Sequence, residues 1–288
     1  MSRQVVLEAR SSSPYGEGFL PYEGHCVPFR PNSTVVGRRL RRRKIPPPVA
    51  FRLDSFEISC HSAAMNPDVK ICGLKTPEAV DRALERGATH IGFIFFEKSP
   101  RYIEPDLAGQ LADRARGKAK IVAVTVNPTN DDLDEIISLV RPDMLQLHGN
   151  ESPERVLTIK AVYNVPVMKA MSVRDADDLR RVESYIGIAD RFLFDAKPPV
   201  GSELPGGNGV SFDWSLMSWL DDRVDYMLSG GVNKDNVALA LASTKATGVD
   251  LSSAVESAPG VKDLSKIDQF FDAFAEACLP EPAAGSRE

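Results

Sequence analysis

From Met65 to the end of the sequence, short β-branched or aromatic runs alternate with amphipathic helical windows, and the alternation occurs eight times. The runs that we predict to be strands cover 69–72, 90–95, 120–126, 144–147, 167–170, 191–194, 226–228 and 248–251. The helical windows lie near 77–86, 106–115, 130–140, 152–162, 175–184, 213–219, 234–243 and 263–278. Strands that are separated by helices pair in parallel, and eight such units in 224 residues match the usual size of a closed (β/α)8 barrel. The repeat therefore predicts an α/β fold of the TIM-barrel class.

An open, doubly wound sheet is the main alternative for a chain of alternating strands and helices. It typically has fewer strands, and the forms that bind dinucleotides carry G-x-G-x-x-G after the first strand. Here the first predicted strand continues into KICGLKT (70–76), which contains a single glycine. The closed barrel is therefore the better prediction.

The first 64 residues differ in composition from the rest of the chain. They hold ten Lys and Arg and five Asp and Glu, which leaves 25 basic and 35 acidic residues for 65–288. The whole-chain net charge of −5 thus combines a +5 segment with a −10 domain. Seven of the 21 prolines and the basic run RRLRRRK (38–44) lie in this segment, which shows no sustained helical or strand period. We predict that 1–64 form a disordered, Pro-rich extension and that 65–288 form the catalytic barrel domain.

The sequence leaves the role of the extension open. Its basic run could bind nucleic acid or act as a localisation patch, and Arg-rich leaders can direct proteins to organelles. Alternatively, the extension has no function, translation starts at Met65, and the upstream residues are an over-extended reading frame.

Composition excludes several classes of protein for the barrel domain. No apolar run approaches the roughly 18 residues that a membrane-spanning helix needs. Four cysteines are too few for a secreted disulfide scaffold of this length and fit reduced thiols. An acidic domain gives no reason to expect nucleic acid. We therefore predict a cytoplasmic protein without membrane or nucleic-acid partners, present as a monomer or a homodimer.

Two reactive side chains stand where predicted strands end, which is where barrels of this class carry their chemistry. Cys72 closes the first strand and Asp195 follows the sixth. Separately, each has a plain alternative reading, as a small core residue or as a helix cap. Together they suggest an acid and a base at one barrel mouth. Lys70 lies on the same side of the first strand, so we expect its ammonium to favour the Cys72 thiolate.

Small and flexible residues follow the last three strands, and we expect them to form a phosphate site and a closing loop. Glycine lets backbone N–H groups approach an oxyanion, and the loops after strands 7 and 8 are where barrels commonly hold phosphate. The predicted phosphate-binding residues are Gly230, Gly231, Ser252 and Ser253. Gly206 and Gly207 lie in a glycine-rich loop after strand 6 that could close over a bound substrate.

Arg101 follows the second strand, and its guanidinium could hold a carboxylate by a two-point fork or could be an ordinary surface charge. The domain contains only two histidines, His90 and His148, and no Cys or His pair has the spacing of metal ligands. We therefore expect no metal site.

Eight segments, taken together, identify a family resemblance. They are KICGLK (70–75), GFIFFEKSPRY (92–102), VAVTVNP (122–128), LQLHGNE (145–151), FLFDA (192–196), LPGGNG (204–209), LSGGVN (228–233) and DLSSAVE (250–256). In this order they resemble phosphoribosylanthranilate isomerase, the barrel enzyme of tryptophan biosynthesis. The resemblance runs from about residue 68 to residue 275 and touches every predicted barrel unit, whereas 1–64 have no counterpart in it.

The resemblance implies an Amadori rearrangement of N-(5-phosphoribosyl)anthranilate without metal or organic cofactor. Asp195 matches the general acid that protonates the ribose ring oxygen, and Cys72 matches the general base that removes the proton from the sugar C2. Arg101 matches the residue expected to hold the anthranilate carboxylate. The Gly230-Gly231 and Ser252-Ser253 loops match the phosphate site.

The sequence departs from the family pattern at two loop positions. Ala254 stands where the family has glycine, so its backbone angle decides whether alanine costs anything. Asn208 stands where threonine is frequent. Two other functions stay open: the histidine-pathway isomerase, which is expected to use two aspartates, and a catalytically silent phosphosugar-binding barrel. Cys72 argues against the first, and the presence of both Cys72 and Asp195 argues against the second.

Overall fold

The computed structural model describes residues 67–196, 212–220 and 222–279. Within these ranges eight parallel strands pair in sequence order and close into a barrel, as predicted. The strands are β1 Asp68–Cys72, β2 His90–Phe95, β3 Lys120–Thr125, β4 Met144–Leu147, β5 Val167–Val173, β6 Arg191–Ala196, β7 Tyr226–Leu228 and β8 Gly248–Leu251. The barrel closes where Asp68 to Ile71 of β1 pair with Gly248 to Leu251 of β8. The extension predicted over 1–64 lies outside the described residues.

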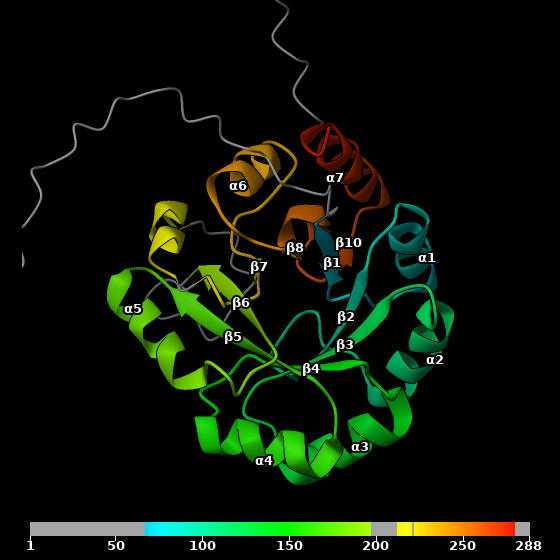
Figure 1. Cartoon of the computed structure of the whole chain (residues 1–288). Helices are drawn as coiled ribbons and strands as arrows, with labels where there is room; N and C mark the ends of the chain where they lie inside the picture. Colours follow the sequence, from blue (N-terminus) through cyan, green and yellow to red (C-terminus); the bar gives the residue numbers. More distant parts are fainter. Residues whose placement is uncertain (1–66, 197–211, 221, 280–288) are drawn as a thin grey trace, which may run out of the picture. The chain divides into compact units, whose positions relative to one another are not determined.

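Helices α1 to α7 are arranged around the outside of the strands (Figure 1). Their bounds are α1 Pro77–Glu85, α2 Pro105–Ala115, α3 Asn130–Val140, α4 Pro153–Tyr163, α5 Ala176–Arg180, α6 Val237–Ser243 and α7 Leu264–Ala277. Three 3-10 helices complete the set: η1 Arg181–Tyr185, η2 Trp214–Trp219 and η3 Ser253–Val255. The window predicted as a helix over 213–219 is thus a 3-10 helix of six residues, four of which are Trp or Ser and have lower α-helix propensity than Leu or Met.

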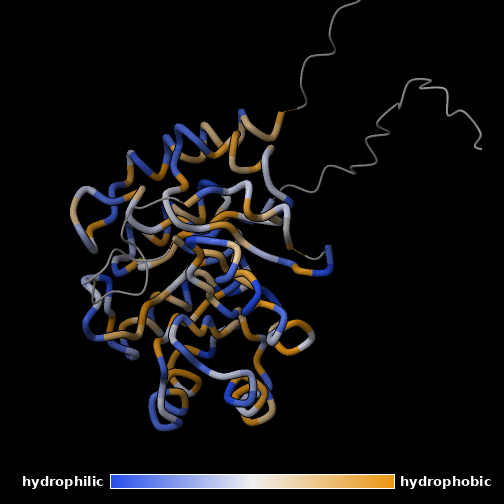
Figure 2. The backbone as a smooth tube through the Cα atoms, turned by 90° about the vertical axis from the view of Figure 1, so that its left-hand side faces the viewer, coloured by the Kyte–Doolittle hydropathy of each residue, from blue (hydrophilic) through white to orange (hydrophobic). Residues whose placement is uncertain are grey.

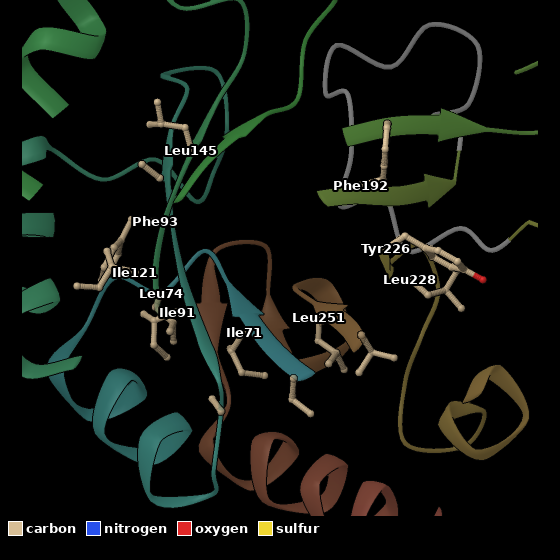
Figure 3. Close-up of a cluster of buried hydrophobic side chains, with 14 of the residues drawn as sticks. Ile71, Leu74, Ile91, Phe93, Ile121, Leu145, Phe192, Tyr226, Leu228 and Leu251 are labelled. Carbon is tan, nitrogen blue, oxygen red and sulfur yellow. The ribbon is translucent and has the colours of Figure 1, made fainter. Parts of the chain in front are cut away.

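Strand side chains alternate strictly between the barrel interior and the helices. On β3, Ile121 and Ala123 belong to the large outer cluster of buried apolar residues, whereas Val122 and Val124 belong to the smaller inner cluster. Outer side chains such as Ile71 and Ile91 lie between strands and helices (Figure 3). Hydrophobic and hydrophilic residues alternate along the helices (Figure 2), a pattern typical of helices that pack one side against a core. The alternation places Lys70 and Cys72 on the inner side of β1.

One element has no counterpart in the predicted strand–helix repeat. Directly after η3 the chain forms a two-stranded antiparallel hairpin of β9 Glu256–Ala258 and β10 Val261–Lys262. Gly260 makes the turn with a φ of +81°, in the left-handed region that glycine tolerates. A Cβ at this position would lie 2.2 Å from the Pro100 carbonyl oxygen, so the turn presses against the loop after β2.

No helix within the described part of the chain is both long enough and apolar enough to cross a membrane.

Candidate active site

A cavity of about 310 Å³ opens at the carboxyl ends of the strands. Its walls come from β1, β2, β3, β4, β6 and β8 and from the loops after β2, β3, β4, β7 and β8. The structure brings seven predicted site residues together in this wall: Cys72, Arg101, Asp195, Gly230, Gly231, Ser252 and Ser253. The predicted closing-loop residues Gly206 and Gly207, and Asn208 beside them, lie outside the described residues.

Cys72 is the last residue of β1 and is almost completely buried. Burial raises the pKa of its thiol above the usual value, and the negative charge of Asp250 acts in the same direction. The ammonium groups of Lys70 and Lys262 oppose this and favour the thiolate. The expectation that the Lys70 ammonium favours the Cys72 thiolate agrees with this, although desolvation is the larger effect and the net pKa of the thiol is raised.

Lys70 is fully buried beneath Cys72, and its Nζ lies 2.8 Å from Oδ1 of Asp250. This ion pair spans the junction of β1 and β8, and Asp250 itself lines the cavity. Gly92, the partner of Cys72 in β2, leaves the space that these side chains need. A Cβ at Gly92 would lie 3.0 Å from the Cys72 Sγ and 3.2 Å from the Lys70 Cε.

Asp195 lies inside β6, one residue before its end, and faces the cavity. Its Oδ1 accepts a hydrogen bond of 2.9 Å from the backbone N–H of Ala196. Its Oδ2 lies 3.7 Å from Nε2 of His148, which follows β4. Burial, with the nearby positive charge of Lys169 and Lys70, lowers the pKa of His148 to about 3. His148 is therefore neutral at physiological pH.

His148 lies between a neighbour on β4 and the carboxyl group of Asp195. Nε2 of Gln146 lies 3.2 Å from Nδ1 of His148. The other ring nitrogen, Nε2, is the one nearest Asp195.

The loops after β7 and β8 form the part of the cavity wall between β6 and β1. Gly230 and Gly231 have φ values of +72° and +79°, and a Cβ on Gly230 would lie 2.4 Å from the backbone nitrogen of Ala196. Glycine is therefore required at position 230. Ser252 donates from Oγ to the carbonyl oxygen of Cys72 at 3.2 Å, which ties the β8 loop to the end of β1. Ala254 is not among the residues with positive φ, so alanine fits the backbone there.

Arg101 is buried instead of lying on the surface, at 4% exposure. Its Nε and Nη2 donate to the two carboxylate oxygens of Glu256 at 2.8 Å each. Nζ of Lys262 lies 2.7 Å from Oε1 of the same carboxylate. The two positive charges hold the pKa of Glu256 below its usual range despite burial.

Sequence reasoning did not assign a role to four residues of this site: His148, Asp250, Glu256 and Lys262. The first was considered only as a metal ligand, although it follows the fourth predicted strand directly. Asp250 could have been found from the alternation, since it shares the inner face of β8. Glu256 ends the family segment DLSSAVE (250–256), but neither it nor Lys262 carried a periodic signal, because the hairpin that holds them breaks the strand–helix repeat.

Comparisons with known proteins show which family the chain belongs to. The family model for N-(5'-phosphoribosyl)anthranilate isomerase matches residues 69–273. A protein of that name from Rhizobium rhizogenes strain K84 is 91% identical over 222 residues, which are 77% of this chain and all of the relative. Relatives of the same name from Rhizobium leguminosarum and Sinorhizobium fredii are 77% and 67% identical, and each is covered completely.

Solved structures give the same result. Phosphoribosyl anthranilate isomerase from Thermotoga maritima is 34% identical with a TM-score of 0.66, over 73% of this chain and 99% of that one. A second structure of such an enzyme, in complex with reduced 1-(o-carboxyphenylamino)-1-deoxyribulose 5-phosphate, is 32% identical with a TM-score of 0.63, over the same shares. With the family model matching more than half of its length, the chain belongs to the N-(5'-phosphoribosyl)anthranilate isomerase family.

Proposed function

We propose that this chain converts N-(5-phosphoribosyl)anthranilate into 1-(2-carboxyphenylamino)-1-deoxyribulose 5-phosphate in tryptophan biosynthesis, with Asp195 as general acid and Cys72 as general base. The observation that carries the proposal is that a carboxyl group, a thiol and two polar glycine or serine loops line one cavity. An acid and a base that share a cavity can move protons at two atoms of one substrate without a cofactor.

The first step opens the sugar ring. The carboxylic acid form of Asp195 donates its proton to the ribose ring oxygen while the C1–O bond breaks, and the nitrogen lone pair forms a C=N bond to C1. The product is an open-chain iminium ion with a hydroxyl at C4. The neutral His148 beside Asp195 suits this step, because it adds no positive charge that would favour the carboxylate over the acid form.

The second step removes the proton from C2. The thiolate of Cys72 takes this proton, the C2–H electrons form a C1=C2 double bond, and the iminium nitrogen becomes neutral. The resulting enolamine then tautomerises, losing the proton of the C2 hydroxyl and gaining one at C1, to give the ketone product. Lys70 and Lys262 assist because their positive charge stabilises the thiolate in a site where burial opposes it.

Two other parts of the cavity wall are suited to bind the two anionic groups of the substrate. The loops at Gly230-Gly231 and Ser252-Ser253 are suited to the phosphate, because positive-φ glycines leave backbone close to a bound oxyanion. Arg101 is suited to the anthranilate carboxylate, because its guanidinium lines the same cavity. The loop with Gly206 and Gly207 remains a prediction for closure over the substrate.

The test follows the loss of substrate fluorescence with wild type, Cys72→Ala and Asp195→Asn. Wild type is expected to turn over, and each variant to lose about 1,000-fold in kcat, because general acid–base catalysis contributes on that order. Turnover by wild type with neither variant markedly slower would contradict the assignment of the two residues. No turnover by wild type would contradict the substrate.

Domain organisation, location and assembly are further parts of the proposal. We assign catalysis to 65–288, and the family match that begins at residue 69 supports this. A cytoplasmic location suits a thiol base, and Cys72 and Cys278 are both free. Deleting 1–64 should leave kcat/KM unchanged, whereas a loss of activity would give the extension a function. Light scattering would distinguish a monomer from a homodimer.

A further inference from the structure

Glu256 forms a buried ion pair with Arg101. It is the first residue of the hairpin after β8, and its side chain is only 3% exposed. Its carboxylate accepts two hydrogen bonds of 2.8 Å from Nε and Nη2 of Arg101 and one of 2.7 Å from Nζ of Lys262. A backbone N–H, that of Gly260, lies 3.3 Å from its second oxygen. A two-point fork of this kind fixes both the place and the plane of a guanidinium.

Two glycines lie close to Arg101, one against its side chain and one against the backbone just before it. Gly73, at a φ of +76°, lies under the side-chain stem, where a Cβ would come within 2.8 Å of the Arg101 Cδ. Gly260 presses against the backbone at Pro100, immediately before Arg101. The end of β1, the loop after β2 and the hairpin after β8 therefore all converge on one arginine. Such confinement leaves the guanidinium little freedom to swing.

The charges of Arg101, Lys262 and Glu256 indicate which kind of ligand the neighbouring cavity could bind. Arg101, Lys262 and Glu256 are all buried and together carry one more positive than negative charge. Lys262 also donates to the carbonyl oxygen of Ser252 at 3.0 Å, so the same cluster borders the phosphate loop. Burying charges is costly, and an apolar set of similar volume would pack at least as well. A cavity bordered by these positive charges is suited to receive an anion there.

We propose that Glu256 is a positioning residue that fixes Arg101 and thereby makes the enzyme selective for a glycosylamine whose aromatic ring carries a carboxylate. The proposal rests on the proposed function, in which Arg101 contacts that carboxylate. Glu256 does not touch the substrate. Its effect is on the orientation of the guanidinium, so its loss should weaken binding of the carboxylate without changing the acid–base steps.

The test compares two substrates that differ only in the carboxylate: N-(5-phosphoribosyl)anthranilate and N-(5-phosphoribosyl)aniline, each made by condensing ribose 5-phosphate with the arylamine. Glu256→Gln keeps the size of the side chain but replaces one acceptor of the fork by a donor. We expect kcat/KM for the anthranilate substrate to fall about 10- to 100-fold, mainly through KM, because charged hydrogen bonds are lost. We expect less than about a 3-fold change for the aniline substrate, so the selectivity ratio should collapse.

A matched control separates selectivity from general damage. Glu151→Gln makes the same change in another buried ion pair, with Lys169 at 3.0 Å, and neither residue lines the cavity. It should lower activity toward both substrates by one factor or not at all. Glu256→Asp keeps the charge but shortens the side chain, and should give an intermediate ratio. It carries the test if Glu256→Gln does not fold, as judged by circular dichroism.

The outcomes are distinguishable. An equal loss toward both substrates with Glu256→Gln, or no loss at all, overturns the proposal and makes the residue structural only. Arg101→Gln serves as the reference and should remove the preference for the carboxylate. If Arg101→Gln leaves the ratio unchanged, or if wild type shows no preference, then the assignment of Arg101 under the proposed function fails first. Loss of the ratio with Arg101→Gln but not with Glu256→Gln overturns the positioning role alone.

Discussion

The two ends of the barrel interior both bury charged side chains, but they use them differently. At the amino ends of the strands, Arg191 is 6% exposed and donates to Asp68 at 2.7 Å and to Thr247 at 2.6 Å. His90 lies beside this group with its Nδ1 4.0 Å from Asp68. At the carboxyl ends, the charged groups line or border a cavity of about 310 Å³.

The difference teaches how to separate stability from function in this fold. At the amino end, Arg191 is bonded to other groups of the protein. Removing one of these partners therefore lowers the stability of the folded state. At the carboxyl end, the thiol, the carboxyl group and the glycine loops face space that a ligand can occupy. Substitutions at the two ends should therefore divide between lost stability and lost activity.

The largest expected effect is on catalysis at the carboxyl end. Cys72→Ala should reduce kcat by about 1,000-fold while changing the free energy of unfolding by no more than about 1 kcal/mol, since the side chain is small. Steady-state kinetics and urea unfolding of the same preparation measure both quantities. A large loss of stability would mean that this end of the barrel is structural too.

Next in size is the loss of stability at the amino end. Arg191→Met should lower the free energy of unfolding by about 2 kcal/mol, because Asp68 and Thr247 lose their hydrogen bonds to the buried guanidinium. The activity of the folded fraction should stay within about twofold, because Asp68, Thr247 and Asp225, to which Arg191 is bonded, do not line the cavity. Urea unfolding with activity assays at low denaturant provides the measurement, and a selective loss of kcat would break the division between the ends.

A smaller effect concerns pH and stability. Burial lowers the pKa of His90 to about 4, from 6.5 for a free histidine. Between these values the unfolded chain binds a proton that the folded chain does not, so this histidine makes stability fall as pH drops from about 7 toward 4. At pH 5.5 its share is about 1 kcal/mol. Wild type should lose this amount relative to His90→Gln, and parallel pH curves for the two proteins would contradict the assignment.

The smallest expected effect is a change in the pKa of the Cys72 thiol at the carboxyl end of the barrel. Lys70→Met removes the ammonium that favours the Cys72 thiolate and leaves the Asp250 carboxylate, which disfavours it. The pKa of the thiol should therefore rise further, and its alkylation by iodoacetamide should shift to higher pH. Cys72→Ser identifies the reacting thiol. An unchanged alkylation profile would show that the Lys70–Asp250 pair does not control the base.

The repeat of strand and helix was sufficient to predict the barrel, and strand alternation placed Lys70 beneath Cys72. Those features depend on local periodicity, which a single sequence displays. The net pKa of Cys72 could not be predicted, because burial depends on residues from other strands. Arg101 was placed in the site, but its partner Glu256 was not, because 155 residues separate them and the hairpin has no periodic signal. Gly206 and Gly207 remain sequence predictions.

The pairing of β1 with β8 also bears on how the enzyme matures. Lys70 and Asp250 are 180 positions apart, and Arg101 and Glu256 are 155 apart, so both ion pairs join early and late parts of the polypeptide. A nascent chain on the ribosome displays β1 as an open edge until β8 emerges, and contacts this distant in sequence form slowly. The event that seals the sheet is the one that completes the active site. A product truncated before Lys262 would therefore be inactive, and one truncated before β8 would also be prone to aggregate.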